Sequence, residues 1–343
     1  MSHQRETSKP ARSLVAELAG VSEATVSRVF NTPSSVSQAK VELVLAAANK
    51  LGYIPDKNAS ALRRKGTGVI LFLEKKVEKR YQWSRIRYYN WFYGDIIRSL
   101  SADIDKTMYQ LRLYSVTSNE EIFELGKKKI CDGIIGFDTE DQETATVLAG
   151  TGIPYVCCGH TEEFTANSCS TDNHKGGFIA AKYLYETGHR KPAYVTGLLD
   201  EVFSHHARKE GFCAGFKDCE VKIIGTDVGK KAGYETGKVL CKSVKKGDID
   251  SIGVVNDLTA IGVIHALMED GIRVPDDVSI IGYDNLPITL SLPFQFSSVE
   301  LSLSKLYSSA LKLLLNSIKT GKAIKHVIEP ELIAGESVIR RET

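Results

Sequence analysis

The sequence predicts an α/β protein with two parts, a small N-terminal three-helix head and a larger body of two doubly wound parallel-sheet lobes. At 343 residues the chain exceeds the size at which a single hydrophobic core stops growing, roughly 250 to 300 residues. Apolar residues recur at helical spacing up to about residue 52, and from residue 69 onward short apolar runs alternate with helical stretches. This alternation is typical of βαβ units, and its restart near KPAYVTG indicates a second lobe.

These patterns divide the chain into a helix-turn-helix head at residues 1–54, a linker at 55–66 and a body at 67–343. We assign the first lobe of the body to about 67–162 and 295–324, and the second lobe to about 163–294 and 325–343.

Composition favours a folded protein without a membrane partner. Hydrophobic residues make up 43% and charged residues 25% of the chain, close to the averages for globular proteins. No apolar run reaches the ~18 residues of a membrane span, and the polar start MSHQRETSKPARS lacks the apolar centre of a secretory signal. We therefore expect a cytoplasmic protein.

Neither a metal, a cofactor nor a catalytic site is predicted. The seven cysteines are scattered without a CxxC pair, so we interpret them as buried small hydrophobes, with a redox role for the adjacent Cys157 and Cys158 as the alternative. The chain has no GxxxxGK[ST], GxSxG or HExxH motif, and His205 and His206 lack ligand spacing.

The stretch LVAELAGVSEATVSRVFN predicts two short helices that cross closely at a tight turn. Ala16 offers a small contact residue, Gly20 tolerates a left-handed backbone, and Val26 returns a β-branched wedge, which is the helix-turn-helix spacing. Leu14, Val15, Leu18 and Ala19 also recur at helical spacing, and Ser22 is a good N-cap for the second helix.

The outward face of the second helix has two interpretations, a solvated surface or a recognition helix in the major groove of DNA. Arg28 could contact guanine bidentately, Glu23 could accept from cytosine, and Ala24 could touch a thymine methyl. Serine and threonine hydroxyls at this helix would contact phosphate. The candidate DNA-contacting residues of the helix are Ser22, Glu23, Ala24, Thr25, Ser27, Arg28 and Asn31.

A third helix begins after Ser37 and ends at Gly52, with Val41, Val44, Leu45, Ala48 and Leu51 on one stripe. The segment that follows is short and basic.

Lys57 to Lys65 spans barely two turns, which is marginal for a free helix. Leu62, among cations, suits insertion between base steps from the minor groove, and Ala59 and Arg63 lie on the same segment. A basic linker is the alternative. The charges agree with a polyanion partner for the head, because residues 1–65 carry ten Lys/Arg against five Asp/Glu, whereas the remainder carries 34 against 37.

Polar residues at the predicted strand ends of the body indicate a ligand cleft. Ligands of doubly wound sheets meet the carboxyl ends of the strands, where Asn256 and Asp257 follow SIGVV and Asp284 follows VSIIGY. Arg208 begins a helix, and Trp91, Phe92 and Tyr93 offer aromatic faces where the first strand gives way to its helix. Such a set suits a polar ring such as a sugar, although strand-end Asp and Asn also cap helices.

Eight segments in order along the chain resemble the lactose-repressor/galactose-repressor (LacI/GalR) family of bacterial transcription regulators. They are LAGVSEATVSRVFN, VSQAKVELVLAAANKLGYIP, ASALRRK, ICDGIIGF, TDNHKGGFIAAKYLYETGHRKPAYVTG, ARKEGF, VVNDLTAIGV and RVPDDVSIIGYDN. The resemblance implies a homodimer that represses transcription from a near-palindromic double-stranded DNA operator. It also implies a hinge helix at Ala59 to Arg64 and a body like periplasmic sugar-binding proteins.

The resemblance further implies that a small effector of the carbohydrate class binds between the lobes and biases operator affinity. By motif, it places Phe92, Tyr93, Asp172, Arg208, Asn256 and Asp284 at effector-contacting positions. The chain departs from the family pattern at Ala11 to Leu14 and at Gly159 and His160. A sugar-binding receptor without a DNA role and an intracellular enzyme on the same two lobes are the alternative functions.

Overall fold

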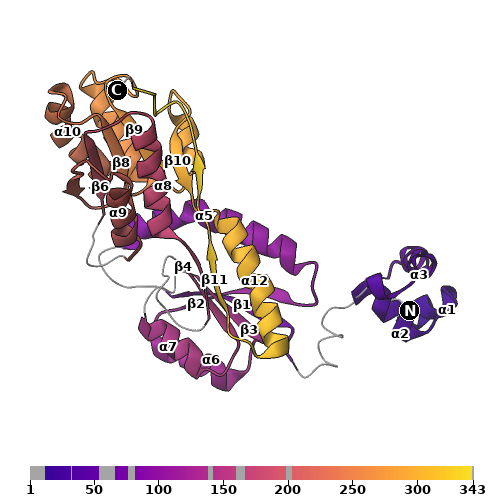
Figure 1. Cartoon of the computed structure of the whole chain (residues 1–343). Helices are drawn as coiled ribbons and strands as arrows, with labels where there is room; N and C mark the ends of the chain where they lie inside the picture. The colour runs from indigo at the N-terminus through magenta and orange to yellow at the C-terminus, as the bar shows by residue number, and fades with distance from the viewer. Residues whose placement is uncertain are drawn as a thin grey trace, which may run out of the picture. The chain divides into compact units, whose positions relative to one another are not determined.

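The computed structural model describes residues 12–31, 33–53, 66–75, 82–137, 142–159, 167–197 and 203–341 (Figure 1). The chain separates into two compact units, one formed by residues 1–69 with 103–110 and the other by residues 70–102 with 111–343. No helix among these described ranges is long and apolar enough to cross a membrane.

The head is a three-helix bundle around a core of small side chains. Its elements are α1 (Arg12–Leu18), α2 (Glu23–Asn31), the short 3₁₀ turn η1 (Pro33–Ser35) and α3 (Gln38–Leu51). The buried core consists of Val15, Ala16, Ala19, Val26, Val29, Val44, Ala47 and Ala48. Leu14, Leu18 and Leu45 share the apolar spacing of the helices but lie outside this core, because each keeps more than two fifths of its surface exposed. Valine and alanine fill the space, since larger side chains would push the helices apart.

The turns of the head follow the predicted chemistry. Gly20 has a φ of 63° and Gly52 a φ of 61°, both in the left-handed region that glycine adopts without a steric penalty. The Ser22 hydroxyl accepts a hydrogen bond from the Thr25 backbone N–H at 3.2 Å, as an N-cap does. Ser37 occupies the N-cap position of α3 without a side-chain cap bond.

The body contains two sheets, as predicted, and each has six strands among the described residues. The first sheet has the order β11-β5-β4-β3-β1-β2, and the second has the order β12-β10-β9-β8-β6-β7. β10 and β12 pair antiparallel, whereas β3 pairs parallel with β1 and β4, β5 with β4 and β11, β6 with β7 and β8, and β9 with β8 and β10. The strands of the first sheet are β1 (Val69–Lys75), β2 (Gln110–Val116), β3 (Gly133–Phe137), β4 (Tyr155–Gly159), β5 (Ser168–Thr171) and β11 (Lys325–Ile328). Those of the second sheet are β6 (Pro192–Thr196), β7 (Lys222–Gly225), β8 (Ser251–Val254), β9 (Ser279–Tyr283), β10 (Ser297–Glu300) and β12 (Glu331–Ile333).

Helices cover the sheets, as expected for doubly wound lobes (Figure 1). They are α5 (Gln82–Ile104), α6 (Asn119–Lys128), α7 (Gln142–Gly150), α8 (Asn173–Glu186), α9 (Phe203–Gly215), α10 (Lys230–Lys245), α11 (Asp257–Glu269), the 3₁₀ turn η2 (Pro287–Ser291) and α12 (Leu303–Thr320). Of these, α12 packs on β3, β4 and β5 of the first sheet, whereas α8 packs closely against α9.

Strand pairing corrects the lobe boundaries that we assigned from the sequence. β5 and β11 pair with each other inside the first sheet, although our boundaries placed residues 163–294 and 325–343 in the second lobe. β10 pairs with β9 in the second sheet, although residues 295–324 were assigned to the first lobe. The chain therefore passes from one sheet to the other three times, after β5, after β10 and after β11. These three strands have only four residues each, too few for a periodic pattern.

Glycines allow α8 and α9 to approach until their backbones touch. A Cβ added at Gly177 would lie 2.0 Å from the Arg208 carbonyl oxygen, and one at Gly211 would lie 1.9 Å from the His174 carbonyl oxygen. Any larger residue would force the helices apart. This contact holds Arg208 on α9 beside the start of α8.

Candidate functional site

The outer face of α2 carries the polar residues that we predicted to contact DNA. Ser22, Glu23, Ala24 and Arg28 are exposed, and Thr25 and Ser27 are partly buried. Val26 and Val29 on the opposite face are buried in the head core. The hydroxyls of Ser22 and Thr25 lie 3.0 Å apart, so both help to start the helix. The helix thus presents one polar stripe with Arg28 in its last turn.

Glu23 has a partner that sequence reasoning missed. Arg12 on α1 donates from Nε to Glu23 Oε2 at 2.9 Å, and its Nη2 lies 2.8 Å from the same oxygen. The two side chains keep 27% and 48% of their surface exposed. Arg12 stands in the segment where the chain departs from the family pattern, and it ties α1 to the start of α2.

Four predicted DNA contacts cannot be placed. Only the backbone of Asn31 is described, as the last residue of α2. Ala59, Leu62 and Arg63 of the predicted hinge lie outside the described residues.

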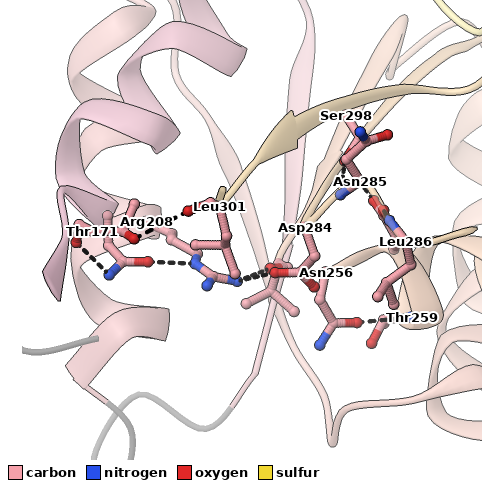
Figure 2. A network of polar contacts seen from close by, with 12 residues as sticks. Thr171, Arg208, Asn256, Thr259, Asp284, Asn285, Leu286, Ser298 and Leu301 are labelled. Atoms are coloured by element: carbon pink, nitrogen blue, oxygen red, sulfur yellow. Dashed lines mark hydrogen bonds and ion pairs between the residues drawn. The ribbon is translucent and has the colours of Figure 1, made fainter. Parts of the chain in front are cut away.

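Arg208 lies at the centre of a buried polar network in the second lobe, shown in Figure 2. Only 3% of its surface is exposed. Its Nε donates to Asn173 Oδ1 at 2.8 Å, and its Nη1 donates to the Val255 carbonyl at 2.7 Å. The guanidinium also stacks 3.8 Å over the centre of the Tyr283 ring. A buried arginine with this set of partners has one fixed orientation.

Asp284 is the counter-charge of Arg208. Its Oδ1 lies 3.5 Å from Arg208 Nη1, and its side chain is fully buried. A desolvated ion pair of this kind is stable only when both partners stay together. The structure therefore brings together two of the predicted effector residues, from α9 and from the end of β9.

Asn256 and Asp172 both act as helix caps, which was the alternative interpretation. The Asn256 side-chain oxygen accepts from the Thr259 N–H at 2.9 Å at the start of α11. Asp172 Oδ1 accepts from the Lys175 N–H at 2.7 Å at the start of α8. Capping uses only one atom of the Asn256 amide. The cap bond uses the amide oxygen and does not involve the Nδ2 donor.

Phe92 and Tyr93 lie elsewhere than expected. We placed them at the junction between the first strand and its helix, but α5 begins at Gln82, so both lie well inside the helix. Phe92 is 9% exposed. The Tyr93 ring makes edge contacts with Phe72 and Phe137 at centroid distances of 5.7 and 5.5 Å. Burial and the nearby Glu74 carboxylate raise the pKa of Tyr93, so the phenol remains neutral.

Asp257 does not serve as the cleft-facing group that its position after β8 predicted. Its Oδ2 accepts from the Leu286 N–H at 2.7 Å, and its Oδ1 accepts from the Ser298 hydroxyl at 2.8 Å. Burial, and then the charge of Asp284, raise the pKa of Asp257 well above its ordinary value.

Asn173 is a network residue that sequence reasoning missed. It is fully buried, and its Nδ2 donates to the Thr171 carbonyl at 3.0 Å while its Oδ1 accepts from Arg208. The only available signal was a second polar residue after Asp172, which resembles an ordinary helix start.

Five of the seven cysteines are buried, as predicted for small hydrophobes, whereas Cys213 and Cys219 are partly exposed. Burial raises the pKa of the Cys169 thiol to about 12 and that of Cys158 well above its ordinary value, so neither thiol readily forms the reactive thiolate. Within the described ranges, no group of three or more His, Cys, Asp or Glu side chains could hold a metal ion.

A helix-turn-helix head followed by a body of two parallel sheets defines a class, that of DNA-binding proteins with a ligand-binding-type body. Two family models match this chain. The lacI family of bacterial regulatory proteins matches residues 15–56, and the periplasmic binding protein-like domain matches residues 181–338.

Known proteins are similar to this chain over nearly its whole length. The HTH-type transcriptional repressor PurR of Pasteurella multocida is 30% identical over 342 residues, covering 95% of this chain and 98% of that protein. The solved complex of the transcriptional regulator CelR with cellobiose has a TM-score of 0.67 and 25% identity, covering 96% of this chain and 100% of the other. A Lac repressor dimer bound to operator and the anti-inducer ONPF has a TM-score of 0.65 at 22% identity, covering 95% and 98%. The chain belongs to the LacI family and is a DNA-binding transcription regulator.

Proposed function

We propose that this regulator is a cytoplasmic repressor that binds a near-palindromic operator as a homodimer. In this proposal α2 lies in the major groove, and Arg28 contacts a guanine. The hinge predicted at Ala59 to Arg64 inserts Leu62 into the minor groove. The observation that carries the proposal is the polar outer face of α2, which lies inside the match to the lacI family at residues 15–56.

The effector in this proposal is a sugar or sugar derivative. The complex of CelR with cellobiose is the relative that supports this class of ligand. Arg208, Asn256 and Asp284 supply guanidinium, amide and carboxylate groups around the carboxyl ends of β8 and β9, and such groups hydrogen-bond hydroxyls. Phe92, Tyr93 and Asp172 complete the proposed set.

In this proposal, effector binding is coupled to operator binding through a change in the arrangement of the two lobes, which the three crossovers between the sheets connect. A ligand that binds one arrangement of the lobes more tightly shifts the population toward that arrangement. In the dimer, this shift would change whether two hinge segments pair as helices on DNA. The marginal stability of so short a helix is then a requirement of the switch.

Operator binding tests the DNA half of the proposal. An operator is first selected from random duplex DNA with the full-length protein, and affinity is then measured at several salt concentrations. We expect Arg28→Ala to weaken operator binding about 10- to 100-fold, since a bidentate guanine contact is worth roughly 1 to 3 kcal/mol. Lys40→Ala removes an equal charge from an exposed position on α3 and should change affinity by less than about threefold. Weak binding without sequence preference would reject the repressor function.

The Leu62→Ala substitution distinguishes this function from that of a sugar-binding receptor without a DNA role. A working hinge predicts a large loss of operator affinity, because the wedge stabilises the bent duplex. Unchanged affinity would count against the hinge. The sugar half is tested separately by thermal shift of the full-length protein with cellobiose and a panel of monosaccharides and sugar phosphates.

A further inference from the structure

We propose that Asp257 is a positioning residue for the effector site. Its carboxylate holds the loop Asp284–Leu286 in the conformation that places Asp284 against Arg208. The inference deepens the effector site proposed above and rests on it, but the loop geometry can be tested without an effector.

The backbone of this loop cannot hold its conformation alone. Asp284 has a φ of 109° and Asn285 a φ of 54°, so two consecutive residues with side chains lie in the region that favours glycine. Such conformations persist only where the surroundings fix them. The loop connects β9 to η2, and Asp284 is its first residue.

Three consecutive backbone N–H groups of the loop are captured, two of them through Asp257. Asp284 donates to the Val299 carbonyl at 2.7 Å. Asn285 donates to Ser298 Oγ at 3.0 Å, and Leu286 donates to Asp257 Oδ2 at 2.7 Å. The Ser298 hydroxyl in turn donates to Asp257 Oδ1 at 2.8 Å, which fixes Ser298 as the acceptor for Asn285. Asp257 therefore holds Leu286 directly and Asn285 through one intermediate.

The surrounding fold leaves space for a carboxylate at this point. Asp257 is fully buried, and a Cβ added at Gly282 would lie 2.2 Å from Asp257 Oδ1. Only glycine at position 282 leaves that space. Asp257 also lies in the first turn of α11, where the helix dipole favours an acidic group.

One carboxylate oxygen accepts from Leu286 of the loop and the other from Ser298 on β10, so Asp257 acts through Asp284 and not by contacting a ligand. Arg208 Nη1 is shared between the Val255 carbonyl and Asp284, and the ion-pair distance of 3.5 Å depends on where the loop lies. If the loop moves, Asp284 leaves Arg208, and two groups of the proposed effector site change together.

Hydrogen exchange of the full-length protein measures loop positioning directly. The variants are Asp257→Ala, which removes both acceptors, and Asp257→Asn, which keeps one. Asp250→Ala is a matched control. Asp250 lies just before β8, and its Oδ2 also accepts from two backbone N–H groups, those of Arg190 and Lys191. We expect the amides of Asn285 and Leu286 to exchange about tenfold faster in Asp257→Ala and about threefold faster in Asp257→Asn. Asp250→Ala should leave them unchanged and speed exchange at residues 190–191.

Binding of cellobiose, measured by calorimetry, separates positioning from general destabilisation. We expect Asp257→Ala to lose at least tenfold in cellobiose affinity, with Asp257→Asn recovering most of it. Operator affinity without sugar should stay within twofold of the wild type in both variants. Asp250→Ala should keep the wild-type affinity for cellobiose.

Wild-type exchange rates at Asn285 and Leu286 in both Asp257 variants would overturn the proposal. An equal loss of cellobiose affinity in Asp250→Ala would also overturn it. If Asp257→Ala does not fold, the Asp257→Asn variant decides the question. A wild-type protein that binds operator but not cellobiose would reject cellobiose as effector, and the exchange rates would then decide the role of Asp257 alone.

Discussion

The polar groups on α2 and those around Arg208 differ in their exposure to solvent and in how far away in sequence their partners lie. On α2 the outward side chains are exposed or partly buried, and the contact between Glu23 and Arg12 spans eleven residues. Around Arg208 the polar partners are buried and distant in sequence, with Asn173 35, Val255 47 and Asp284 76 residues away. A face that remains in solvent can be read from helical periodicity, whereas a buried network depends on which strands and helices meet.

The contrast predicts that substitutions in the buried network cost far more stability than substitutions on the head. Four variants test it, in order of decreasing expected effect.

Arg208→Ala should have the largest effect, because it leaves Asp284 buried without its counter-charge. Removing one partner of such a pair costs about 3 kcal/mol, which would lower the melting temperature of the body by about 6 to 12 °C. Calorimetric unfolding measures this change. Arg190→Ala is the control, since the exposed Arg190 stacks 3.9 Å over Tyr185 and should contribute about 1 kcal/mol or less. Equal shifts for the two arginines would contradict the contrast.

Gly177→Ala should come next, at about 2 kcal/mol, since a Cβ would meet the Arg208 carbonyl at 2.0 Å and force α8 from α9. Gly150→Ala at the end of α7 has no atom within 4 Å of the added Cβ and should be neutral or slightly stabilising. Urea unfolding of both variants makes the comparison. A neutral Gly177→Ala would show that the two helices are not in contact.

Gly20→Ala should cost about 1 kcal/mol in the head, because alanine at a φ of 63° meets its own backbone. The added Cβ has no other atom within 4 Å, so the cost is purely conformational. Gly20→Asn should recover much of the loss, since asparagine tolerates this region better. Amide exchange of residues 12–53 in the full-length protein reports the difference, and indistinguishable Ala and Asn variants would argue against a backbone cause.

Glu23→Gln should have the smallest effect on stability, at most about 1 kcal/mol, because the ion pair with Arg12 is partly exposed. The same exchange measurement at low and high salt checks this value. A loss above about 2 kcal/mol would show that the pair contributes more than a partly exposed ion pair does.

Much of the head could be predicted because its determinants are local. Ala16, Gly20 and Val26 fixed the crossing of α1 and α2, and the polar stripe of α2 followed from the same periodicity. Leu14 and Leu18 have the same spacing but remain exposed, because helical spacing alone does not say which of two apolar stripes meets the neighbouring helix.

The body was predicted less completely. Arg208, Asn256 and Asp284 were found from strand ends and motifs, and Arg208 and Asp284 do lie together. Asp257 was predicted to face the ligand cleft but accepts from a backbone loop, and Asn173 was missed. A polar residue at a strand end has the same sequence signature in either case. Phe92 and Tyr93 were misplaced because the sequence did not show that α5 begins at Gln82.

The sequence by itself determined that the chain has a helix-turn-helix head and a body of alternating strands and helices, because spacing, caps and strand runs are properties of neighbouring residues. The tertiary structure alone decided that the chain crosses between the sheets after β5, β10 and β11. It also decided that Asp257 serves the backbone of the Asp284 loop. The physical reason is that a buried polar group is stable only beside a matching partner, and the fold brings those partners together from distant parts of the chain.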